Sequence, residues 1–288
     1  MTGPATWILG ARPRTLPAAV APVLAGTGAA ALDGEVSWWK AATALGVSLA
    51  LQIGVNYAND YSDGVRGTDD DRVGPVRLVG AGLASPRAVK RAAILSLGVG
   101  AGLGFLLAAT TSWWLLAIGA VAVVAAWTYT GGPKPYGYLG LGEISVFVFF
   151  GLVAVIGTTY VQIEQVTRAS AAAGVAVGAL ACAILVANNL RDVETDAGSG
   201  KRTLAVHLGD RRTRYLFLGL GLVAAAGVAV CATSAPLAAL GFLGLPLWLR
   251  AAAPVASGAR GPALIPVLQA TGLAELVTAA GLAIGFAL

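Results

Sequence analysis

The stretch SAAAGVAVGALACAILVANNLRDVETD, residues 170–196, decides the fold class. Its first part, roughly 170–190, is an uncharged and mostly apolar run, and about 20 such residues are enough for a helix to cross a membrane. Its last part carries three acids directly after that run. We therefore expect a transmembrane helix that ends in an acidic motif at the membrane surface.

The composition of the whole chain agrees with this expectation. Of its 288 residues, 57% are hydrophobic and only 11% are charged, whereas soluble domains contain about 25% charged residues. The segments that qualify as membrane-spanning lie roughly at 15–32, 40–58, 89–109, 112–130, 140–161, 170–190, 214–232, 235–250 and 264–286. These runs are continuous, which argues against a β-barrel, where polar and apolar residues alternate. The sequence thus predicts an all-α, polytopic transmembrane bundle of about nine helices in a single domain, residues 1–288.

Segment 235–250 is the weakest of these candidates. It is short, and its Pro236 and Pro246 lack the backbone N–H that a helix interior uses. A bundle of eight helices is therefore the alternative.

The basic residues predict how the chain is oriented. If the N-terminus is cytoplasmic, 17 of the 19 Lys and Arg lie in cytoplasmic segments, the exceptions being Lys40 and Arg168. This asymmetry is the positive-inside pattern. We expect a multi-pass protein of the inner (plasma) membrane, with its N-terminus and its functional loops, 59–88 and 191–213, in the cytoplasm. The net charge of +5 then reflects orientation and anionic lipid headgroups, not a nucleic acid partner.

Two acidic motifs open these two loops. Their polar residues are Asn56, Asp60 and Asp63 in the first motif and Asn188, Asp192 and Asp196 in the second. In each motif an Asn precedes an Asp by four residues, and the motifs begin 132 residues apart (188 − 56). This repetition indicates two related halves, arranged around a cavity that faces the cytoplasm.

The spacing within the motifs indicates metal binding. Residues four apart share one face of a helix, so Asn56 with Asp60, and Asp192 with Asp196, direct their oxygens the same way. Stacked carboxylates repel each other unless a cation lies between them. Hard oxygen ligands suit Mg²⁺, which takes one or two carboxylates together with water and substrate phosphate. We therefore expect the two motifs to hold Mg²⁺ and a diphosphate. For Asp69–Asp71 a solvated loop is an equal alternative.

A diphosphate also requires protein cations. Arg72, Arg77 and Lys201 follow the acidic motifs closely, and Arg and Lys both bind phosphate oxygens. The alternative is that these charges only set the topology. That alternative is weakest for Lys201, which lies in the glycine-flanked turn GSGKRT.

The motifs NDYSD (59–63) and RDVETD (191–196), in a chain of this topology, resemble the UbiA-type intramembrane prenyltransferase superfamily over nearly the whole length. Three longer stretches resemble the branch that prenylates 1,4-dihydroxy-2-naphthoate. They are RVGPVRLVGAG (72–82), YTGGPKPYGYLGLGE (129–143) and NNLRDVETDAGSGKRTLAVHLG (188–209). In relatives a further Asp often lies four residues after the position of Asp63, and this chain has Gly67 there. Which of Asp69–Asp71 reaches a metal therefore stays open.

The resemblance implies a Mg²⁺-dependent reaction of menaquinone synthesis. A polyprenyl group passes from polyprenyl diphosphate to 1,4-dihydroxy-2-naphthoate, CO₂ and diphosphate leave, and demethylmenaquinol results. Asp60, Asp192 and Lys201 would be catalytic, and Tyr129 and Lys134 would contact the acceptor. The alternatives are another aromatic acceptor (a hydroxybenzoate, a haem or a chlorophyll precursor), a CDP-alcohol phosphotransferase, or a transporter. Prenyl chain length and oligomeric state stay open.

Three further residues carry weaker signals. Glu143 lies near the start of a predicted helix, where a carboxylate complements the helix dipole. Glu275 lies in the middle of the last apolar segment, where an acid is a functional candidate. His207 is the only histidine, so no histidine cluster for a metal exists. We expect Glu275 to be structural or to border a cavity for the prenyl tail.

Overall fold

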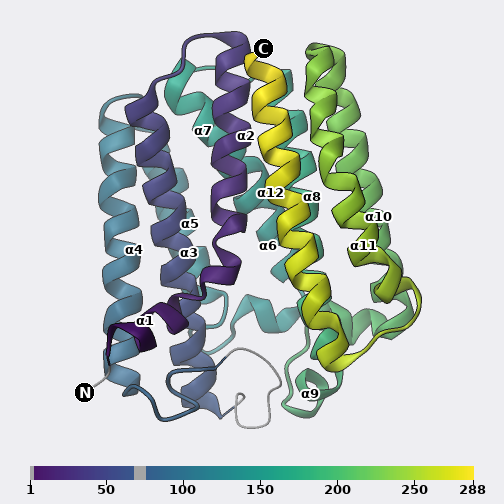
Figure 1. Ribbon diagram of the computed structural model, residues 1–288. Helices are drawn as coiled ribbons and strands as arrows, with labels where there is room; N and C mark the ends of the chain where they lie inside the picture. The colour runs from purple at the N-terminus through teal and green to yellow at the C-terminus, as the bar shows by residue number, and fades with distance from the viewer. Residues whose placement is uncertain (1–2, 68–75) are drawn as a thin grey trace.

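The computed structural model describes residues 3–67 and 76–288. Over these residues the protein is a bundle of helices without β-strands, so the predicted all-α fold is confirmed. The N-terminus and the short helix α9 lie at one end of the bundle, and the C-terminus lies at the other (Figure 1).

The helices follow the apolar segments of the sequence. The first half contains α1 (Pro4–Ala11), η1 (Pro13–Thr15), α2 (Pro17–Asp33), α3 (Trp38–Arg66), α4 (Pro86–Ala109), α5 (Leu115–Thr128) and η2 (Tyr136–Leu139). The second half contains α6 (Gly142–Val146), the π-helical η3 (Phe147–Val153), α7 (Ala154–Ile163), α8 (Arg168–Arg191), α9 (Val193–Gly198), α10 (Leu204–Ser234), η4 (Pro236–Gly244), α11 (Leu245–Ala256), η5 (Gly261–Leu264) and α12 (Ile265–Ala287). Each of the predicted apolar segments coincides with helical structure.

Seven helices of the described chain are long and apolar enough to cross a membrane, and the bent pair Pro4–Thr15 and Pro17–Asp33 makes an eighth if it counts as one span. The apolar helix α5, with 14 residues, is too short to be counted as a membrane span. The segment 235–250, which the sequence marked as the weakest candidate, does form part of a span. There, η4 and α11 join into one span of 21 residues, Pro236–Ala256. Both of its first prolines lie at the start of a helical segment, where a missing N–H costs nothing.

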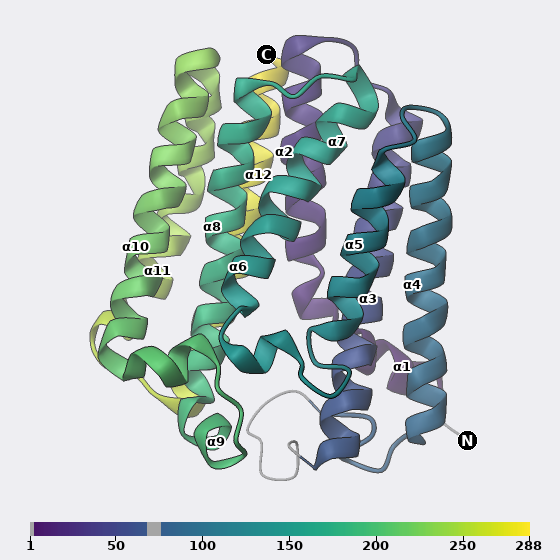
Figure 2. The ribbon, with the colours of Figure 1, turned by 180° about the vertical axis from the view of Figure 1, so that it is seen from behind.

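Helix α8 is the central element of the bundle. Of its most apolar 18-residue window, 78% is buried, more than in any other span of the described chain. It packs against α2, α10, α12 and η3. A Cβ added at Gly151 of η3 would lie 2.6 Å from the Cα of Gly178 of α8, so the two backbones touch only because both residues are glycines. This packing places the end of α8, with the second acidic motif, at the same end of the bundle as the first (Figures 1 and 2).

Helix α10 begins ten residues before the predicted segment 214–232. The early part is a separate turn, because Gly209 has a left-handed φ of 74° that breaks the helix and that glycine adopts without steric cost. Beyond the break, the buried guanidinium of Arg214 binds both carboxylate oxygens of Asp210 at 2.7 and 2.8 Å. It also donates to the carbonyl oxygens of Val255 and Ala259. Arg214 thereby joins α10 to the end of α11.

We expect Arg214→Ala to lower the free energy of unfolding in detergent by about 2 kcal/mol, because the two carbonyls and Asp210 lose a charged donor. Arg212→Ala is the matched control, since Arg212 is exposed on the same helix. Thermal melts of both variants measure the difference. Equal melting temperatures would show that the Arg214 contacts do not stabilise the bundle.

Candidate functional site

The first acidic motif lies on the last turns of α3, which continues beyond the predicted segment 40–58 to Arg66 and so carries Asn56, Asp60 and Asp63 on one helix. Asp60 is fully buried. Its two carboxylate oxygens accept hydrogen bonds from the backbone N–H groups of Leu78 and Val79, at 2.8 and 2.9 Å. Asp60 therefore holds the segment after the first loop against α3.

Asn56 joins the same motif to the N-terminal segment. Its side-chain nitrogen donates to the carbonyl oxygen of Ala11 and to the hydroxyl of Thr15, at 2.9 and 3.0 Å. The break between α1 and α2 is therefore held against α3. Since the amide nitrogen binds protein atoms, the amide oxygen is the atom of Asn56 that suits a cation.

Asp63 lies next to two groups from other parts of the chain. Only 3% of it is exposed. The hydroxyl of Tyr138 donates to its Oδ1 at 2.5 Å, and an Arg77 nitrogen lies 3.7 Å from its Oδ2. Arg77, a predicted diphosphate contact, therefore lies beside the first acidic motif.

The second acidic motif spans the junction of α8 and α9. Arg191 binds both oxygens of Asp192, at 2.7 and 2.6 Å, and also donates to the side-chain oxygen of Asn188. Asp196, on α9, lies 3.7 Å from the ammonium of Lys201. Lys201 is thus beside the second motif, as Arg77 is beside the first.

A mostly apolar cavity of about 350 Å³ reaches the first motif. Asn56, Asn59, Tyr129 and Tyr136 line one part of it. Other lining residues belong to a separate apolar cluster, namely Val23, Ala44, Leu107, Leu115 and Val161. Ala44 and Asn56 are twelve residues apart on α3, about 18 Å of helix. The cavity is therefore a long apolar space with a polar end.

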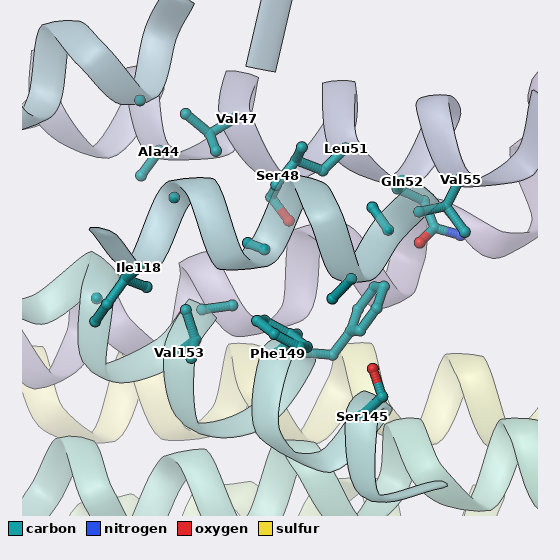
Figure 3. A pocket seen from close by; sticks show the side chains of 18 of the residues that line it. Ala44, Val47, Ser48, Leu51, Gln52, Val55, Ile118, Ser145, Phe149 and Val153 are labelled. Atoms are coloured by element: carbon teal, nitrogen blue, oxygen red, sulfur yellow. The ribbon is translucent and has the colours of Figure 1, made fainter. Parts of the chain in front are cut away.

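The walls of this cavity come from α2, α3, α4, α5, α6, η3 and α7. Figure 2 turns α5 and α7 toward the viewer. Figure 3 shows Ala44 and Ile118 toward one end of the cavity and Gln52, Val55 and Ser145 toward the other. A slender apolar molecule fits such a space better than a compact polar one.

Residues 19–262 match the UbiA prenyltransferase family. The chain belongs to this family. The 1,4-dihydroxy-2-naphthoate octaprenyltransferase of Mycobacterium tuberculosis is 59% identical over 279 residues, which cover 97% of this chain and 96% of that protein. The enzyme of the same name from Escherichia coli is 41% identical over 72% of this chain and 70% of its own.

Solved structures of UbiA homologs share the fold. One from Archaeoglobus fulgidus, bound to DMAPP and Mg²⁺, has a TM-score of 0.69 at 17% identity and covers 98% of this chain and 99% of its own. One from Aeropyrum pernix has a TM-score of 0.75 at 14% identity, with 93% and 97% covered. The helical bundle is therefore that of UbiA proteins.

Three motif acids of this UbiA chain, Asp63, Asp192 and Asp196, lie beside cations. Among the described residues, no three His, Cys, Asp or Glu side chains lie close enough together to hold a metal ion. Mg²⁺ needs only one or two carboxylates when water and phosphate supply the rest. Asp63 and Asp196 fit this requirement best, because their ion pairs with Arg77 and Lys201 are long, 3.7 Å each. Asp192 would first have to exchange its contacts with Arg191.

Of the two predicted acceptor contacts, Tyr129 lines the cavity and Lys134 does not. Tyr129 lies next to Tyr136 in an edge-to-face contact. A phenol is protonated at neutral pH, so the hydroxyl of Tyr129 is a hydrogen-bond donor. Lys134 is exposed in the segment between α5 and η2. Asp69–Asp71 and Arg72 lie outside the described residues.

Arg66 and Tyr138 lie at the site, although sequence reasoning assigned neither of them a role. Arg66, at the end of α3, donates to the carbonyl oxygens of Thr130 and Gly132. Its guanidinium also lies over the ring of Tyr138. Neither residue belongs to an acidic motif. The only available signal was that Tyr138 lies in a stretch that resembles the naphthoate branch.

The other weak signals have packing partners. The carboxylate of Glu143 accepts a hydrogen bond at 2.9 Å from Asn189, which directly follows Asn188 of the second motif. A Cβ added at Gly140 would lie 3.1 Å from His207, which places the histidine against the turn after η2. Glu275 is fully buried within α12. Its predicted role, either structural or bordering a cavity for the prenyl tail, stays a prediction.

Proposed function

We propose that this chain transfers a polyprenyl group from polyprenyl diphosphate to 1,4-dihydroxy-2-naphthoate in menaquinone synthesis, with loss of CO₂ and diphosphate. The observation that carries the proposal is the long apolar cavity whose polar end is formed by Asn56 and Asn59 of the first acidic motif. A prenyl tail in this cavity would bring its diphosphate to the acids and cations of the motifs. The names of the relatives support the naphthoate as acceptor.

The residues around the cavity's polar end would have two separate roles, binding the diphosphate and binding Mg²⁺. Arg77 and Lys201 would bind the diphosphate, because each already lies beside a carboxylate that a metal would neutralise. The proposed Mg²⁺ ligands are Asn56, Asp60 and Asp63 in the first motif and Asn188, Asp192 and Asp196 in the second. When bound, Mg²⁺ would neutralise the charge of the departing diphosphate. The Mg²⁺ in a solved UbiA structure supports this choice of metal.

Tyr129 is the residue best placed for the acceptor and the prenyl cation. Its ring lines the cavity at the polar end, where the bond between tail and diphosphate would lie. An aromatic face stabilises a nearby positive charge. Its hydroxyl would donate a hydrogen bond to an acceptor oxygen. The apolar walls would keep water from reacting with the cation.

The chain is a multi-pass membrane protein. We further propose that it lies in the inner membrane, with the N-terminus and both motifs on the cytoplasmic side. The distribution of Lys and Arg supports this orientation.

The test is turnover by purified protein in detergent with 1,4-dihydroxy-2-naphthoate, a polyprenyl diphosphate and Mg²⁺. We expect a prenylated, decarboxylated naphthoquinol together with equimolar diphosphate, and no product after chelation of Mg²⁺. 4-Hydroxybenzoate is the matched acceptor control and should give no product. Prenylation of the benzoate in place of the naphthoate would overturn the acceptor, and Mg²⁺-independent turnover would overturn the metal.

A further inference from the structure

Tyr138 contacts Asp63 of the first acidic motif and Lys201, which lies beside Asp196 of the second motif. It comes from the short helix η2, far in sequence from either motif. Its hydroxyl donates to Asp63 of the first motif at 2.5 Å. Its ring centroid lies 5.1 Å from the ammonium of Lys201, and its carbonyl oxygen accepts the N–H of Arg202 at 3.1 Å. One side chain therefore joins the end of α3 to the segment that follows α9.

The hydroxyl contact restrains the carboxylate of Asp63. A short hydrogen bond to a charged acceptor is among the stronger ones in proteins. Each carboxylate oxygen has two lone pairs, so Oδ1 can accept from Tyr138 and still face a cation. Outer partners of this kind orient a ligand, and their loss typically lowers metal affinity about 10–100-fold. Tyr138 is therefore placed to set the direction in which Asp63 presents its oxygens.

The ring contact restrains Lys201. The ammonium lies over the ring of Tyr138 and, at the same time, 3.7 Å from Asp196 of the second motif. The guanidinium of Arg66 also lies near this ring, 5.4 Å from its centroid. A cation over an aromatic face is attracted to it, most strongly away from water. The ring therefore holds the ammonium of Lys201 and the guanidinium of Arg66 near the carboxylates of the motifs.

The backbone around η2 keeps Tyr138 in this position. The N–H of Gly137 donates to the carbonyl oxygen of Tyr129, at 3.0 Å, which ties η2 to the end of α5. Gly140 then ends the turn with a left-handed φ of 78°. The position of Tyr138 is thus set by the chain on both sides of it.

We propose that Tyr138 is a positioning residue that joins the two acidic motifs into one diphosphate site, its hydroxyl orienting Asp63 and its ring holding Lys201. The inference rests on the proposed function, because it concerns the same Mg²⁺–diphosphate site. It assigns a role to a residue outside both motifs. Loss of the hydroxyl should weaken Mg²⁺ binding through Asp63, and loss of the ring should also weaken diphosphate binding through Lys201.

The test uses Tyr138→Phe, which removes only the hydroxyl, and Tyr138→Leu, which also removes the ring. Tyr215→Phe is the matched control, because it removes an exposed tyrosine hydroxyl from α10. The binding probe is Mg²⁺ with inorganic diphosphate, and the readout is the rise in melting temperature as Mg²⁺ is titrated without acceptor. We expect Tyr138→Phe to need about 10–100 times more Mg²⁺ for the same rise, and Tyr215→Phe to match wild type.

Kinetics provide a second readout that a loss of structure would not produce. In Tyr138→Phe the Mg²⁺ concentration for half-maximal turnover should rise while the KM for the naphthoate stays at the wild-type value. In Tyr138→Leu the KM for polyprenyl diphosphate should rise as well. In an Asp63→Asn background, Tyr138→Phe should cause no further loss of Mg²⁺ affinity, because the contact is already altered from the other side.

The outcomes separate this proposal from the proposed function. If wild type binds Mg²⁺–diphosphate and Tyr138→Phe binds it equally well, the role of Tyr138 is overturned and the function stands. If wild type itself shows neither binding nor turnover, both are overturned. If Tyr138→Phe melts early without ligand, the Asp63→Asn pair and the Leu variant decide. A further loss of Mg²⁺ affinity on adding Tyr138→Phe to Asp63→Asn, or wild-type Mg²⁺ affinity in Tyr138→Leu, would overturn the role.

Discussion

Asp63→Asn and Asp196→Asn are each expected to lower the rate of prenyl transfer by at least about 100-fold, the usual scale for removing a charged group that stabilises a transition state. Both side chains are nearly buried, with 3% and 8% exposed. Asparagine has the same shape but no charge, so it would bind Mg²⁺ weakly and remove the carboxylate beside Arg77 or Lys201. The measurement is kcat/KM for the naphthoate at saturating Mg²⁺.

Asp33→Asn is the matched control for these two variants. Asp33 is the last residue of α2, at the end of the bundle opposite α9, and should leave the rate unchanged. Asp60→Asn is less informative, because Asp60 also anchors the N–H groups of Leu78 and Val79, and its loss would lower stability as well. A wild-type rate in Asp63→Asn would remove Asp63 from the site.

Local patterns were sufficient to predict the framework of this site. The apolar runs place the helices, because the length of a run and the charges at its ends are properties of short segments. The four-residue spacing of Asn56 and Asp60 requires only that α3 is a helix there. The structure adds that α3 continues to Arg66, so that Asp63 lies on the same helix.

Contacts between distant segments could not be predicted in this way. The link from Asp63 to Tyr138 joins residues 75 positions apart, and nothing in either segment indicates the other. The pairing of Asp192 with Arg191 was equally hidden, because neighbours in sequence at a helix end have no fixed relative direction. The predicted segment 214–232 missed the start of α10, because the first turn, residues 204–208, is too short to show a helical period and is followed by Gly209 and three charged residues.

Gly157→Leu is expected to shift the protein's preference from long to short prenyl diphosphates. Gly157 lines the cavity on α7, one turn before Val161 of the apolar cluster at the cavity's far end. A Cβ at Gly157 meets nothing within 4 Å, so leucine would extend into the cavity without displacing protein atoms. A long tail would then have to compress or leave the cavity. Overpacking costs about 1–3 kcal/mol, roughly a 5–150-fold loss in kcat/KM for the long donor.

The ratio of kcat/KM for a long donor to that for dimethylallyl diphosphate measures this effect and cancels any general loss of activity. The short donor ends before Gly157 if its diphosphate lies at the acidic motifs, so its rate should stay near that of wild type. Gly102→Leu is the matched control, because Gly102 on α4 is also open but faces away from the cavity. An unchanged ratio in Gly157→Leu would mean that the tail lies elsewhere, along the lipid-facing surface of the bundle.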